Sequence, residues 1–91
     1  SEKSVTEKQQ RMDERRRNKA LQAEQRRKER RIEALEQLIS DLEEEIEELN
    51  QKMCLEEYMT DYGKLTELSD IIADKKEQLA GAYEEWAVLS E

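Results

Sequence analysis

A heptad repeat of apolar residues constrains the fold of this chain more than any other feature of its sequence. Isoleucine and leucine alternate at intervals of three and four residues, in the order Ile32, Leu35, Ile39, Leu42, Ile46, Leu49 and Met53. This spacing is typical of a helix that packs against another helix in a left-handed coiled coil. A second, less regular seam follows at Leu65, Leu68, Ile72, Leu79, Ala82, Trp86 and Leu89.

The second seam departs from the regular pattern in two places. Lys75 stands where an apolar residue is expected. Either its alkyl stem lies on the seam while its ammonium points outward, or the seam shifts at this point, as Ile71 and Lys76 suggest. The segment 80–82 has little side-chain bulk, so a close approach of the partner helix is expected there.

The heptad repeat lapses at residues 54–61, and Thr60 or Asp61 is suited to cap the helix that follows. Two amphipathic helices joined by a short loop predict an all-α, antiparallel two-helix coiled-coil hairpin over residues 23–91. The first helix should end at about residue 53, with a loop over about 54–60 and a second helix over about 61–90. Residues 1–22 carry no seam and are predicted to form a basic connecting arm, frayed or disordered.

A reversal of the chain near residue 57 places apolar residues opposite one another at each level. It pairs Leu49 with Leu65, Ile46 with Leu68, Leu42 with Ile72 and Leu35 with Leu79. The same register places Trp86 near Lys28 and Leu89 near Gln25. Trp86 is then either an apolar cap on the open end of the seam or lies against Lys28, Arg31 or Ile32, with a cation–π contribution from a basic partner. A long-helix parallel dimer competes with this hairpin, because isoleucine and leucine alternate in the manner that favours dimers. The loop and the register favour the monomeric hairpin.

The composition argues against an enzyme and against a membrane protein. The chain of 91 residues has no histidine and one cysteine, and it lacks both a phosphate-binding loop and an apolar run long enough for a membrane span. Its glutamate clusters are interpreted as a solvated helix face rather than a metal site. We therefore expect a cytoplasmic, non-catalytic piece of a larger protein, without a cofactor of its own.

Charge is segregated along the chain, although the net charge is −8. Residues 1–31 hold 12 basic and 6 acidic residues, whereas residues 32–91 hold 4 basic and 18 acidic residues. We call residues 15–31 the basic segment. Its candidate phosphate-binding residues are Arg15, Arg16, Arg17, Lys19, Arg26, Arg27, Lys28, Arg30 and Arg31. On a helix they would surround it rather than form one stripe, so contact with phosphates is expected without readout of sequence. The alternative is a solvated helix face without a binding role.

Three stretches carry a resemblance to a known family: LEEEIEELN at 42–50, YMTDYGKLTEL at 58–68 and YEEWAVLSE at 83–91. The more specific features are Asp61, Tyr62, Lys64 and Leu65 in the second stretch, and Trp86 and Leu89 in the third. They resemble the C-terminal coiled-coil domain of ABC-F ATPases, which are soluble twin-cassette ATP-binding proteins.

The resemblance implies that the parent protein uses ATP and Mg²⁺ in cassettes that precede this domain. It also implies a role on the ribosome in translation, with DNA or ribosomal RNA as the partner of the basic segment. The alternative function is a structural spacer or a protein-docking hairpin that contacts the cassettes or a ribosomal protein.

Overall fold

A computed structural model describes residues 2–91 and shows three helices in this range: α1 (Glu2–Lys52), α2 (Glu56–Met59) and α3 (Tyr62–Leu89). No strand occurs among these residues, so the prediction of an all-α chain is confirmed. The contacts divide the chain into two units, Ser1–Arg31 and Ile32–Glu91, and we call the second one the hairpin unit.

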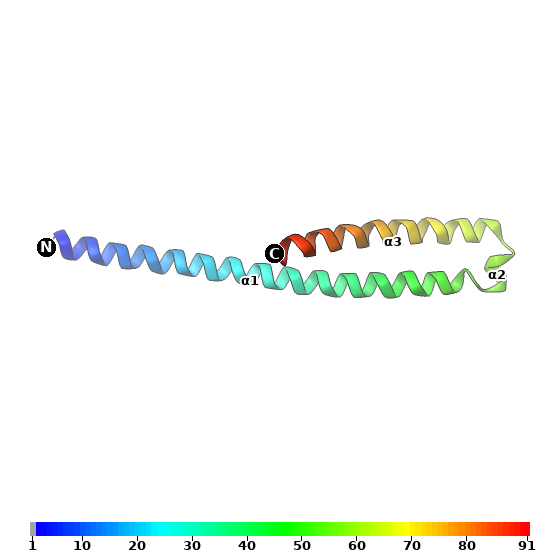
Figure 1. Ribbon diagram of the computed structural model, residues 1–91, viewed down its shortest axis with the longest axis horizontal. Coiled ribbons are helices and arrows are strands. Elements are labelled where there is room, and N and C mark those ends of the chain that lie inside the picture. Colours follow the sequence, from blue (N-terminus) through cyan, green and yellow to red (C-terminus); the bar gives the residue numbers. More distant parts are fainter. Residues whose placement is uncertain (1) are drawn as a thin grey trace. The chain divides into compact units, whose positions relative to one another are not determined.

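The hairpin unit is a pair of antiparallel helices, formed by the part of α1 from residue 32 to residue 52 and by α3 (Figure 1). Its core draws on both predicted seams and comprises Leu35, Ile39, Leu42, Ile46, Leu68, Ile72 and Ala82. Leu35 is the most deeply buried, with 1% of its surface exposed. The stripe is narrow because each helix buries only the face that meets its partner, while the other faces remain in solvent.

The connection between the helices is a helical turn rather than an open loop. After α1 ends at Lys52, residues 56–59 form α2, which packs beside α3. The chain reverses at Thr60 and Asp61, and α3 begins directly afterwards. The Asp61 side chain caps α3, because its Oδ1 accepts a hydrogen bond from the backbone nitrogen of Lys64 at 3.1 Å. The cap therefore falls on one of the two residues that were predicted for it.

The helices are paired in a different register from the expected one. Trp86 was expected near Lys28, but its Nε1 donates a hydrogen bond to Oε1 of Glu36 at 3.4 Å. Leu89 was expected near Gln25, but it packs against the core cluster of Leu35, Ile39 and Ala82. The partners are displaced by about one heptad because the chain reverses near residue 60 rather than 57. Each residue by which the reversal point moves displaces the facing partner by two.

Residues 2–22, for which a frayed or disordered arm is expected, belong to α1 in the structure, and Ser1 lies outside the described residues. Within this stretch the larger apolar side chains are exposed: Val5, Met12 and Leu21. They build no apolar core, in agreement with the absence of a seam from this part of the sequence.

Only part of segment 80–82, whose side chains are small, lies against the partner helix. Ala82 is buried at the seam, but a Cβ added to Gly81 would meet no atom within 4 Å. Gly81 therefore lies on an open face of α3, where glycine only lowers helix stability.

The substitution Gly81→Ala is expected to raise the free energy of unfolding by about 0.5–1 kcal/mol, because alanine restricts the unfolded chain and fits the helix without a clash. Urea denaturation followed by circular dichroism measures the change. Ala80→Gly is the matched control on the neighbouring exposed position and should cause a loss of similar size. A destabilising Gly81→Ala would show that the backbone is closely approached at this point.

Candidate nucleic-acid interface

The basic segment lies entirely within α1, so all nine predicted phosphate-binding residues are presented on helical backbone. Eight of them are exposed, and Lys28 is half-buried. Arginine and lysine favour helix, which explains why a segment this rich in charge adopts regular structure. An exposed helix presents its cations to solvent and to any polyanion that approaches.

The nine bases are spread unevenly around the helix. At 3.6 residues per turn they cover roughly two-thirds of the circumference. Four of them recur at intervals of four, seven and four residues and fall within about 60° of one another: Arg15, Lys19, Arg26 and Arg30. The remaining sector carries neutral and acidic residues: Glu14, Asn18, Gln25 and Glu29. The bases are therefore broadly distributed, as expected, but one face holds the densest row.

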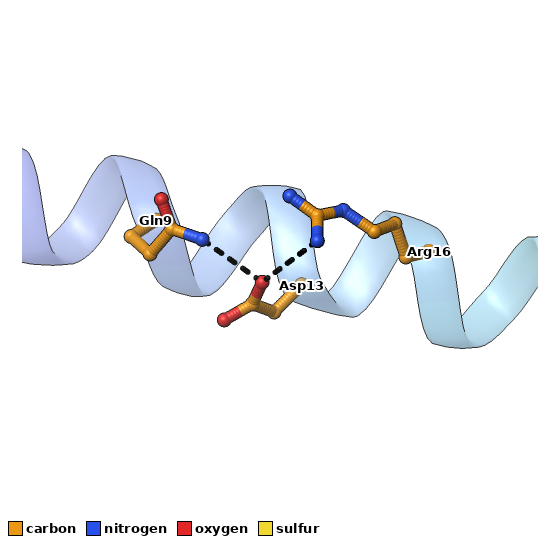
Figure 2. Close-up of polar contacts among 3 residues, drawn as sticks. All are labelled: Gln9, Asp13 and Arg16. Carbon is orange, nitrogen blue, oxygen red and sulfur yellow. Dashed lines mark hydrogen bonds and ion pairs between the residues drawn. The ribbon is translucent and has the colours of Figure 1, made fainter.

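Local polar contacts between neighbouring turns accompany this charge (Figure 2). The Nε2 of Gln9 donates a hydrogen bond to Oδ1 of Asp13 at 3.1 Å, and Nη1 of Arg16 lies 3.9 Å from the same oxygen. Further along, Nε2 of Gln25 donates to Oε1 of Glu29 at 3.1 Å. Exposed pairs of this kind contribute little to stability, so Arg16 can exchange Asp13 for a phosphate oxygen at small cost.

Among the polar contacts that link the helices of the hairpin unit, three join pairs of residues that the sequence did not predict. Nζ of Lys75 lies 2.8 Å from Oε2 of Glu45, which places the ammonium outside the seam, the first of the two alternatives for Lys75. The other two contacts are the Trp86–Glu36 hydrogen bond and a hydrogen bond from the Tyr83 hydroxyl to Oε1 of Glu43 at 3.1 Å. This bond to Glu43 raises the pKa of Tyr83, because it stabilises the protonated phenol.

Charge separates the two units sharply, since the hairpin unit holds 18 acidic and only 4 basic residues. A polyanion is repelled by such a surface and attracted by the basic segment. The cationic surface of this chain is therefore concentrated in α1 before residue 32.

No group of three or more metal-ligating side chains is placed to hold a metal ion within residues 2–91. No helix within this range is long and apolar enough to cross a membrane.

The fold and the charge distribution define a class of protein: an all-α coiled-coil accessory domain with a basic helical segment. The family model described as ABC transporter C-terminal domain matches residues 23–91, which is more than half of the chain. The chain therefore belongs to the family of ABC transporter C-terminal domains. Neither a curated protein nor a solved structure gives a significant match.

Proposed function

We propose that this chain is the nucleic-acid-binding accessory domain of an ABC-F type ATPase in the cytoplasm. In this proposal the basic segment contacts the phosphates of DNA or of ribosomal RNA, while cassettes elsewhere in the parent protein bind and hydrolyse ATP with Mg²⁺. The hairpin unit has no catalytic part in this scheme. A role on the ribosome in translation follows from the ABC-F assignment and belongs to the same proposal.

The segregation of charge carries the proposal. Nine cationic side chains lie within the 17 residues of the basic segment, on exposed helix, in a chain whose net charge is −8. A solvated helix face needs no such separation of sign, whereas a phosphate-binding surface does. The basic residues cover much of the helix circumference. This arrangement suits contact with the phosphate backbone of a nucleic acid and gives no directed readout of nucleobase edges.

The ABC-F assignment is supported by the residues that carry the resemblance. Asp61 caps α3 and Leu65 is half-buried beside it, at the end of the hairpin unit where the chain reverses. At the other end of α3, Trp86 is bonded to Glu36 and Leu89 packs against the core. The motif residues therefore have structural tasks at both ends of α3.

A protein-docking or spacer role is the second candidate. The observation that favours it is the hairpin unit itself, an antiparallel helix pair rich in acidic residues. In that case the basic segment would pair with an acidic protein surface instead of a nucleic acid.

Fluorescence anisotropy with labelled duplex DNA and a structured RNA, at several salt concentrations, tests the nucleic-acid proposal. If about four of the nine bases contact phosphates, the logarithm of the duplex affinity should fall against the logarithm of salt with a slope of about −3 or steeper. The ratio of the two affinities then identifies the preferred nucleic acid. Failure to bind either one at low salt would contradict the proposal and favour the docking hairpin.

A further inference from the structure

A shallow groove lies between α1 and α3 of the hairpin unit, and all the residues that line it lie outside the basic segment. It has a volume of about 240 Å³ and is lined by Glu36, Ile39, Tyr83 and Trp86. Ile39 belongs to the buried core, whereas the two aromatic side chains remain 44% and 36% exposed. The groove therefore joins an apolar residue of the core to two exposed aromatic rings and a carboxylate.

The two aromatic side chains are fixed by their polar edges. Trp86 donates its Nε1–H to Glu36, and Tyr83 donates its hydroxyl to Glu43. Both bonds run from α3 to α1, so each ring is linked to the opposite helix, which restricts its freedom before a ligand binds. Tyr83 and Trp86 therefore combine exposure to solvent with a hydrogen bond to the opposite helix.

The electrostatics of the groove select a cation. Glu36, which lines the groove, accepts the Trp86 hydrogen bond through Oε1, and a carboxylate has acceptor capacity beyond a single bond. A neighbouring groove lined by Glu43, Ile46, Glu47, Asn50, Lys76 and Leu79 adjoins this one through Glu43, which bonds to Tyr83. Lys76 supplies a positive charge to that second groove, whereas no basic residue lines the first.

We propose that the groove of Glu36, Ile39, Tyr83 and Trp86 binds an arginine side chain of a basic protein segment. A guanidinium stacks on an indole or phenol face, and its N–H groups are donors for carboxylate oxygens. A nucleic acid is excluded here by the acidic charge of the hairpin unit. A purely apolar peptide would cover the charge of Glu36 without supplying a cation to compensate it. This site does not depend on nucleic-acid binding by the basic segment.

The position of Trp86 provides a direct reporter, because it is the only tryptophan in the chain. The probe is a short capped peptide of alternating arginine and glycine, with matching lysine–glycine and glutamate–glycine peptides as controls. The arginine peptide should change the tryptophan emission saturably. The lysine peptide should need a several-fold higher concentration, and the glutamate peptide should have no effect.

Glu36→Gln keeps an oxygen acceptor for Trp86 but removes the charge at the groove, so it should weaken the arginine response at least three-fold. Glu44→Gln is the matched control, because Glu44 is an exposed carboxylate of the same helix that lines neither groove. Circular dichroism of both variants establishes that the helices are intact.

Three results would overturn the proposal. One is a response to the arginine peptide that rises without saturation, which would indicate diffuse attraction. The second is an equal weakening by Glu36→Gln and Glu44→Gln. The third is an emission change produced by concentrating the chain without peptide, with sedimentation showing a dimer, since a second copy would then be the occupant.

Discussion

Replacing Leu35 with alanine is expected to lower the free energy of unfolding of the hairpin unit by about 2–5 kcal/mol. Leu35 is 1% exposed and lies in the core cluster with Ile39 and Ala82, against which Leu89 packs. A thin helix pair cannot collapse around the resulting space without separating its helices. A unit of this size has only a few kcal/mol of total stability, so much of it would be lost. Thermal and urea denaturation followed by circular dichroism measure the effect.

Leu38→Ala is the matched control for this prediction. Leu38 is the same residue type on the same helix, three residues further on, but it is 42% exposed. Its replacement should change the free energy of unfolding by less than about 1 kcal/mol, because little buried surface is lost. Equal effects of the two substitutions would contradict the assignment of Leu35 to the core and of Leu38 to its edge.

Removing three charges from the densest face of the basic segment is expected to weaken duplex binding on the order of 10²-fold at about 0.1 M salt. The substitutions are Arg15→Gln, Arg26→Gln and Arg30→Gln, which keep a long side chain of good helix propensity. Each lost phosphate contact should also reduce the magnitude of the salt slope by about 0.9. Anisotropy titrations of the native and substituted chains measure both quantities.

The control for this variant changes the net charge by the same amount within the hairpin unit. It carries Lys52→Gln, Lys64→Gln and Lys76→Gln, three exposed lysines of that unit. Binding should change by less than about three-fold, because these cations stand among 18 acidic residues. Comparable losses in the two variants would mean that only the net charge matters and that the basic segment is no interface.

The apolar seams could be predicted because burial of a helix face leaves a periodic record in the sequence. All four buried residues of α1 and all three of α3 occupy positions of the predicted seams. The helix cap at Asp61 could also be predicted from the sequence, since a side-chain oxygen before an amphipathic stretch is a local signal. These features depend on residues that are close together in the chain.

The register could not be obtained in the same way, because a heptad repeat is nearly unchanged by a shift of seven residues. The seams of the two helices bring apolar residues together in both registers, the expected one with Trp86 beside Lys28 and the observed one with Trp86 beside Glu36. The turn decides between these registers, and its short helix α2 (Glu56–Met59) has no periodic pattern of its own. The groove of Glu36, Tyr83 and Trp86 depends on the register, so the sequence alone could not predict it either.

The candidate phosphate-binding residues were found from charge alone, and their arrangement depends on helix geometry. Once residues 15–31 are helical, the spacing of Arg15, Lys19, Arg26 and Arg30 places them on one face. The expectation of a frayed or disordered N-terminal arm left that face undefined. A charge count identifies the segment, but the backbone conformation is needed to choose which cations to remove.

The most direct test of nucleic-acid binding through the basic segment is a residue-resolved titration. Backbone amide signals of the ¹⁵N-labelled chain would be followed by NMR while duplex DNA or structured RNA is added at low salt. We expect shifts and line broadening to centre on residues 15–31, while the amides of residues 32–91 stay close to their free positions. Changes centred on residues 32–91, or no changes with either nucleic acid, would contradict this expectation.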